Sequence, residues 1–188
     1  MNGDRLRAFV ALVPDTASRD VLHALPVAHG ARRTLAEQLH VTLAFLGAIE
    51  RDRCDALAAR LPALAAANAL PLQYVGRLAW WPSMPRARLI VAELDVDAAV
   101  AVLNDALSAA LREFGLPVER RPFRPHVTLA RLPREAVGQP AHGGALRKPV
   151  ALRFDALTLF ESVLSHHGAS HRPIVSAPIA LADAGADG

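Results

Sequence analysis

The chain has 188 residues, of which 52% are hydrophobic and 21% charged, enough to bury the core of one domain without disulfide bonds. The single cysteine, Cys54, excludes an internal disulfide, and the apolar run at residues 8–13 is too short for a signal peptide or a membrane span. We therefore expect a cytoplasmic protein without membrane association. The net charge is +3, and every basic residue except Lys148 is an arginine. Arginine suits phosphate binding, although codon bias explains the excess more simply.

Strand and helix patterns alternate in the first half of the chain. In chain order we predict a strand, a helix, a strand and a helix at residues 6–13, 16–25, 40–46 and 52–68. The first strand is expected to be buried on both faces, and the first helix to begin at Asp15 or Thr16 as its N-cap. Residues 32–38 are polar and predict a loop. Gly47 ends the second strand, and Pro62 is expected to kink or split the second helix.

The second half continues with two strands, a helix and three more strands, at residues 72–79, 87–94, 97–114, 126–132, 150–160 and 172–181. Residues 80–85 contain two tryptophans and two prolines and are expected to form the turn between the first two of these strands. Gly115 ends the helix. Residues 134–149 predict a loop, and Pro173 and Pro178 confine the last strand to an edge. Because strands and helices mix without strict alternation, we expect an α+β fold with a largely antiparallel sheet.

One five-residue sequence, His-Val-Thr-Leu-Ala, occurs twice. It stands at residues 40–44 and again at residues 126–130, each time on a predicted strand that follows a polar or basic connector. Such self-similarity indicates two related lobes, each of which gives one strand to a shared centre. We therefore expect one bilobal domain over residues 1–182, followed by a disordered tail at residues 183–188.

The alternation of side chains along a strand gives the repeat its chemistry. His40 and Thr42 share one face of their strand, as do His126 and Thr128, while the valines and leucines between them face the core. Two imidazoles with pKa values of about 6.5 can serve as base and acid on a cyclic phosphate, each contributing about 10²–10⁴-fold. The threonine hydroxyls can donate to the phosphate oxygens. This chemistry requires no metal or other cofactor, and it leaves open which histidine is the acid.

Other interpretations of these residues stay open. Each histidine also suits a half-buried strand residue with a backbone partner, or the repeat reflects duplication without catalysis. His166, His167 and His171 raise a metal site, but Gly168 and Pro173 argue against the helix that would present them, so a flexible polar loop is the simpler interpretation. A noncatalytic RNA-binding module is a further alternative, although the chain has few aromatic side chains on which bases would stack.

The two motifs that begin at His40 and His126 resemble the paired H-x-T-x motifs of the 2H phosphoesterase superfamily. The wider context is similar to one branch, the bacterial and archaeal RNA 2′,3′-cyclic phosphodiesterases, historically called 2′-5′ RNA ligases. The similarity covers roughly residues 5–165. Supporting segments lie at residues 7–12, 39–47, 121–131 and 159–162. Two motifs at this spacing are a specific signal, whereas one alone is weak.

This resemblance implies a bilobal α+β fold of two pseudo-symmetric lobes, with flanking helices and with the two motif strands at a central cleft. It implies hydrolysis of RNA 2′,3′-cyclic phosphate ends to 2′-phosphates without a cofactor, with His40 as proton donor and His126 as proton acceptor. Substrate contacts are implied or expected for four further residues: Phe9, Thr42, Thr128 and Arg131. In reverse, with a 5′-hydroxyl as nucleophile, the same chemistry is ATP-independent 2′-5′ ligation.

The expected partner is therefore RNA with a 2′,3′-cyclic phosphate end. A small cyclic nucleotide, such as an ADP-ribose cyclic phosphate, is the alternative within the enzyme class. Arg120, Arg121 and Arg124 either steer RNA toward the site or form a solvated basic edge. We expect a monomer with no obligatory protein partner.

Two features depart from the family pattern. Family members often carry a tyrosine near the C-terminus that helps to hold the substrate. The only tyrosine here is Tyr74, and the corresponding residues 165–171 read Ser-His-His-Gly-Ala-Ser-His. Strict alternation also puts Arg131 on the strand face opposite His126, so only a bulge or the end of the strand lets it reach a phosphate.

Overall fold

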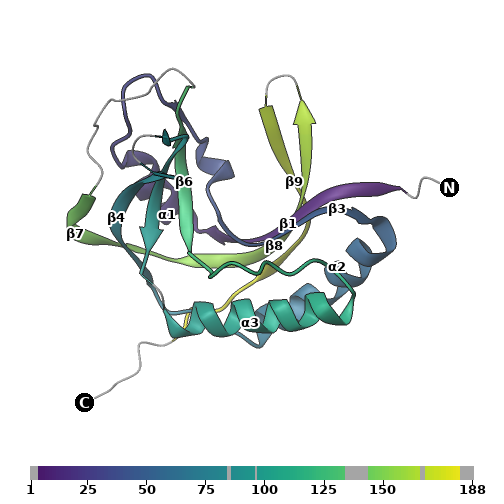
Figure 1. The fold of residues 1–188 in the computed structure, drawn as a ribbon. Helices are drawn as coiled ribbons and strands as arrows, with labels where there is room; N and C mark the ends of the chain where they lie inside the picture. Colours follow the sequence, from purple (N-terminus) through teal and green to yellow (C-terminus); the bar gives the residue numbers. More distant parts are fainter. Residues whose placement is uncertain (1–3, 84–85, 96, 134–143, 166–167, 183–188) are drawn as a thin grey trace, which may run out of the picture.

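The computed structural model describes residues 4–83, 86–95, 97–133, 144–165 and 168–182. The helices are α1 Thr16–Ala24, the short 3-10 helix η1 Ala36–Gln38, α2 Arg51–Ala66 and α3 Ala98–Glu113 (Figure 1). The strands are β1 Arg5–Pro14, β2 Arg32–Arg33, β3 Val41–Glu50, β4 Gln73–Trp81, β5 Leu89–Leu94, β6 His126–Arg131, β7 Gly144–Leu152, β8 Phe154–Ser165 and β9 Gly168–Pro178. Within these ranges no helix is both long enough and apolar enough to cross a membrane.

One continuous sheet forms the body of the fold. Its strand order is β7-β4-β5-β6-β3-β1-β8-β9, all neighbours are antiparallel, and β2 pairs with β6. The predicted α+β class with a largely antiparallel sheet is therefore confirmed. Figure 1 shows α2 and α3 packed side by side along one side of the sheet, while the β8–β9 hairpin extends away from it.

The sheet has an approximate two-fold arrangement around β3 and β6, the two strands that carry the repeat. Outward from β3 lie β1, β8 and β9, and outward from β6 lie β5, β4 and β7. In one half, α1 lies in the connection from β1 to β3, and in the other half α3 lies in the connection from β5 to β6. The two lobes predicted from the repeat are these two halves, and each contributes one motif strand to the centre.

Leucine stripes on the two long helices are buried in the core. Leu57 and Leu61 of α2, like Leu103 and Leu107 of α3, have no exposed surface. Each such side chain stabilises the fold by about 1.5–3 kcal/mol relative to an exposed one. This packing on both sides of Pro62 outweighs the one backbone hydrogen bond that the proline removes, so α2 continues to Ala66 and the predicted split does not occur.

The predicted helix ends are confirmed by their hydrogen bonds. Asp15 caps α1 by accepting from the Ser18 N–H at 2.8 Å, and Asp97 caps α3 by accepting from the Ala99 N–H at 2.7 Å. Gly115 follows α3 with a φ of 62°, a left-handed conformation that favours glycine and closes the helix. Substituting either aspartate by alanine would cost about 1 kcal/mol of stability.

Three predicted boundaries are wrong because neighbouring strands override the local sequence. Trp80 and Trp81 belong to β4 rather than to a turn, since they pair with Ile90 and Leu89 of β5. The predicted loop at 134–149 ends in β7, an edge strand whose mostly exposed side chains give no alternation signal. The strand predicted at 150–160 is divided between the end of β7 and β8.

Further corrections concern two segments that were predicted to be loops. Residues 32–38 contain β2 and η1, where β2 pairs with the last two residues of β6. The strand β9 begins at Gly168, so His171 lies on a strand and not in a flexible loop. The predictions for residues 134–143, for His166 and His167 and for the tail at 183–188 fall outside the described residues.

Candidate active site

The strands β3 and β6 meet through the residue pair Val41 and Val127, both of which are buried. The residues that flank this pair point to the other face and are half-buried: His40, Thr42, His126 and Thr128. Because the strands are antiparallel, each histidine lies beside the threonine of the other motif. The structure thus brings the four predicted residues together on one face of the sheet.

Each histidine is held by a backbone contact of the same kind. The Nδ1 atom of His40 lies 2.7 Å from the carbonyl oxygen of Gln38, and the Nδ1 atom of His126 lies 2.8 Å from that of Arg124. A carbonyl oxygen only accepts, so each Nδ1 carries the hydrogen and donates it. In the neutral form, each Nε2 is therefore a free acceptor, which is the state that a general base requires.

A β-bulge in each motif strand changes the face on which the later residues lie. In β6, Thr128 pairs with Val91 and Ala130 with Ile90, so one residue between them is extra. Leu129 and Ala130 are consequently both buried, and Arg131 is exposed. The bulge brings Arg131 to the face of His126, which resolves the conflict with strict alternation.

The same bulge occurs at the same place in β3. There Thr42 pairs with Ala11 and Ala44 with Val10, while Leu43 and Ala44 are both buried. Phe45 therefore reaches the face of the histidines and is 66% exposed. Phe45 and Arg131 occupy equivalent positions in the two copies of the repeat.

An aromatic cluster supports His40. Phe9 of β1 lies opposite both Phe45 and Phe160 in the sheet, and its ring centroid is 5.1 Å from that of His40. Phe9 is only 3% exposed, so in this structure it packs beneath the imidazole. The substrate contact predicted for Phe9 stays a prediction, and the exposed ring of the cluster is that of Phe45.

A tryptophan supports His126 in the other half of the sheet. The Trp81 ring lies 4.2 Å from the His126 ring between centroids, and its Nε1 donates to Glu93 at 2.9 Å. The same carboxylate accepts from Arg124 at 2.8 Å, and the Arg124 guanidinium lies over the indole at 4.5 Å. Arg124 thus belongs to the support of His126. Arg121, by contrast, pairs with the exposed Glu119.

A sequence model of the 2′-5′ RNA ligase superfamily matches residues 13–164, a range that contains both motifs. The chain belongs to this superfamily. Its members are 2H phosphoesterases, and the matched range contains both histidine motifs of this chain.

Two relatives that are similar in sequence share the name RNA 2′,3′-cyclic phosphodiesterase. The RNA 2′,3′-cyclic phosphodiesterase of Bacillus subtilis (strain 168) is 27% identical over 123 residues, which are 65% of this chain and 67% of the relative. The protein of the same name from Geobacillus stearothermophilus is 30% identical over 95 residues, half of this chain but only 30% of the relative. The match to the Geobacillus protein thus leaves most of that protein uncovered.

Two solved structures share the fold of this chain. The protein TT0787 of Thermus thermophilus is 21% identical, with a TM-score of 0.76 over 94% of this chain and 99% of that chain. E. coli LigT complexed with 3′-AMP is 24% identical, with a TM-score of 0.65 over the same shares. At these identities the likeness establishes the fold alone.

Burial lowers the pKa of both histidines and so favours their neutral form. Burial is the main cause that lowers the pKa of His40 to about 4, with further lowering by His171, His126 and Arg131. Burial also lowers the pKa of His126, whereas its backbone hydrogen bond and Glu93 oppose the shift. A bound anion would raise both pKa values, because it stabilises the protonated imidazole.

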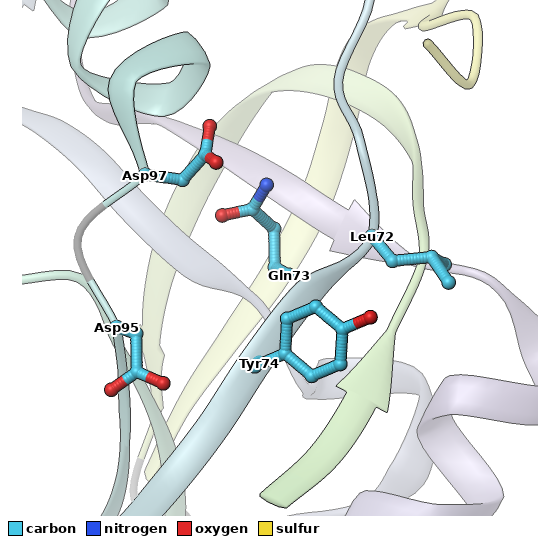
Figure 2. Close-up of a pocket in the computed structure, with 5 residues that line it drawn as sticks. All are labelled: Leu72, Gln73, Tyr74, Asp95 and Asp97. Atoms are coloured by element: carbon cyan, nitrogen blue, oxygen red, sulfur yellow. The ribbon is translucent and has the colours of Figure 1, made fainter. Parts of the chain in front are cut away.

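A separate pocket lies between β4 and the start of α3. Figure 2 shows its lining residues, Leu72, Gln73, Tyr74, Asp95 and Asp97, with the Gln73 amide directed toward Asp97. None of them belongs to the two motifs, and Asp97 is already engaged as the cap of α3. Within the part of the chain that the structure describes, no group of three or more His, Cys, Asp or Glu side chains is arranged to hold a metal ion.

Four residues beside the two histidines were not assigned to the site from the sequence: Phe45, Trp81, Glu93 and His171. Phe45 was recoverable, because it stands in the first motif where Arg131 stands in the second. Glu93 and Trp81 gave no signal, since only the pairing of β4, β5 and β6 places them beside His126. His171 lay in a stretch whose strand character the glycine and proline obscured.

Proposed function

We propose that this protein hydrolyses RNA 2′,3′-cyclic phosphate ends to 2′-phosphomonoesters. The observation that carries the proposal is the duplicated imidazole geometry, in which His40 and His126 each donate from Nδ1 to a carbonyl oxygen two residues earlier. Two equivalent Nε2 atoms on one face suit an in-line displacement at phosphorus, where one imidazole faces the attacking water and the other the leaving oxygen. The names of the Bacillus and Geobacillus relatives support the same substrate.

In the proposed reaction, His126 is the base and His40 the acid. The neutral His126 Nε2 takes a proton from water, whose oxygen attacks the phosphorus. The bond from phosphorus to the 3′-oxygen breaks, and that oxygen takes a proton from the Nε2–H of His40. His40 acquires this second proton when the anionic substrate raises its pKa from about 4.

The remaining motif residues are proposed to stabilise the phosphate. Thr42 and Thr128 would donate from their hydroxyls to the non-bridging oxygens, where negative charge increases in the transition state. Arg131 would add a guanidinium, which can give two hydrogen bonds to one phosphate. Its closeness to the site is indicated by its effect on His40, since its charge lowers the pKa of that imidazole.

The first test follows ring opening on a short RNA that ends in a 2′,3′-cyclic phosphate, with EDTA present. The wild type is expected to produce the 2′-phosphate, and His40→Ala and His126→Ala to lose about 10²–10⁴-fold in rate while still binding RNA. If the ring stays closed while RNA binds, the protein is a binding module. If only a small cyclic nucleotide is opened, RNA is not the substrate.

The second test assigns the two roles. In a substrate whose bridging 3′-oxygen is replaced by sulfur, the leaving thiolate departs without protonation. We expect this substrate to restore activity to His40→Ala and to leave His126→Ala impaired. Rescue of the opposite variant would exchange the acid and base assignments.

A further inference from the structure

His171 places a third imidazole beside the proposed active site. It lies on β9, opposite Ser162 of β8, and its ring stands edge-on to those of Phe9 and His40. The centroid distances are 4.9 Å to Phe9, at 80° between planes, and 5.5 Å to His40, at 89°. The pairing of β8 with β1 therefore carries a residue from near the end of the chain into contact with the first motif.

The Nδ1 atom of His171 is buried and has no hydrogen-bond partner within the described part of the chain. The backbone of Ser170 lies near the ring and raises the pKa of His171. It is not positioned to form a hydrogen bond with Nδ1. A neutral imidazole carries its hydrogen on one nitrogen only. Because an unpartnered buried N–H is rarer than an unpartnered buried acceptor, the hydrogen belongs on Nε2. His171 is thus the opposite tautomer from His40 and His126.

The surroundings of His171 also favour its neutral form. Burial is the main cause that lowers its pKa, and the charge of Arg131 lowers it further. From β1 and β8 it meets the rings of Phe9 and Phe160, which do not titrate. On its own strand, the neighbouring Arg172 pairs with Glu161 at 3.7 Å. Protonation would also place a hydrogen on the unpartnered Nδ1, which further favours the neutral ring with its hydrogen on Nε2.

We propose that His171 is a substrate-binding residue, which donates from Nε2–H to an oxygen of the phosphate held between His40 and Arg131. The inference rests on the proposed function for the identity of the bound group. The separation of the His40 and His171 rings supports it, since hydrogen bonds of about 2.9 Å allow one phosphate group to contact both rings. Two imidazoles would then carry protons to and from the reaction, and the third would hold the phosphate without exchanging a proton.

The test compares variants that remove or replace the donor. Adenosine 2′-monophosphate is the binding probe, measured by calorimetry, and RNA with a 2′,3′-cyclic phosphate end is the substrate. His171→Phe keeps a ring but no donor, and we expect about tenfold weaker binding and a similar rise in KM from pH 6 to 8. His171→Gln and His171→Tyr restore a donor and are expected to bind within about threefold of the wild type. His23→Phe, which alters an exposed histidine of α1, is the matched control.

Nitrogen NMR of the wild type tests the tautomer independently of whether any variant folds. We expect hydrogen on Nε2 in His171 and on Nδ1 in His40 and His126, and a shift of the His171 Nε2–H on binding the probe. The inference is overturned if His171 carries its hydrogen on Nδ1, if His171→Phe binds as tightly as the wild type, or if the wild type does not bind the probe. If the probe binds through His171 but the cyclic phosphate stays closed, the proposed function fails and this inference stands.

Discussion

Trp81 lies against the imidazole of His126 with the two ring centroids 4.2 Å apart, and Glu93 fixes the indole by accepting a hydrogen bond from its Nε1. Because Glu93 also accepts from Arg124, whose backbone carbonyl accepts from His126, one carboxylate holds both residues that contact the imidazole. The orientation of His126 is therefore set by residues of β4 and β5 that do not belong to the motif.

Glu93→Gln is expected to lower kcat about tenfold with little change in KM, because the neutral amide weakens the support of His126 without touching the substrate. The pKa of His126 should fall further, since the charge of Glu93 raises it. Ring-opening kinetics and an NMR titration of the imidazole measure the two effects. The matched control is Glu119→Gln, which removes an equal charge from an exposed pair with Arg121. Equal effects in both variants would refute the positioning role.

Arg131→Ala is expected to lower kcat/KM about 10–100-fold, the range for a lost charge-assisted hydrogen bond to phosphate. The kcat/KM of Arg131→Lys should lie between those of the wild type and Arg131→Ala, because lysine keeps the charge and lacks the planar fork. The pKa of His40 should rise in the alanine variant, since Arg131 lowers it in the native protein. Arg60→Ala, on the exposed side of α2, is the control. Unchanged kinetics in Arg131→Ala would remove this residue from the site.

The lowered pKa of His40 predicts that the free energy of unfolding depends on pH. An unfolded chain binds a proton at this residue near pH 6.5, whereas the native chain does so only at about pH 4. The depressed native pKa therefore gives stability that is present above pH 6.5 and is lost as the pH falls toward 4, at most about 3 kcal/mol. Urea unfolding of the wild type and His40→Asn between pH 7 and 4.5 should show a flatter decline in the variant. His23→Asn should keep the wild-type slope.

A companion NMR titration measures the same imidazole directly. The midpoint for His40 in the free protein is expected at about pH 4 and should move upward when adenosine 2′-monophosphate binds. A free-protein midpoint near 6.5 would contradict the burial that the structure gives this ring.

The duplicated motif allowed the two histidines and two threonines to be predicted from the sequence, because strand periodicity alone decides that they share a face. The position of Arg131 was not predictable in the same way. A bulge depends on the register against β5, and the sequence of β6 does not contain that register. The α3 boundaries were predictable because Asp97 and Gly115 are local signals at the helix ends.

Long-range pairing explains the remaining differences between prediction and structure. The polar edge strand β7 forms only because β4 offers it a partner, and β9 is a strand only beside β8. His171 consequently reaches His40 through two strand pairings, from β9 to β8 and from β8 to β1. Contacts of this kind are a property of the assembled sheet and leave no pattern in the residues near His171.

The difference between Phe45 and Arg131 makes the two halves at the centre of the sheet chemically unequal. If both copies of the repeat ended in the same residue, the repeat itself would offer a small ligand the same side chains in either of two opposite orientations. With an exposed aromatic ring in one half and a guanidinium in the other, those two orientations differ in energy. In the proposed function, a nucleotide, whose apolar base and charged phosphate lie at opposite ends, would then be held in one orientation. That orientation would also decide which histidine faces the water and which faces the leaving oxygen.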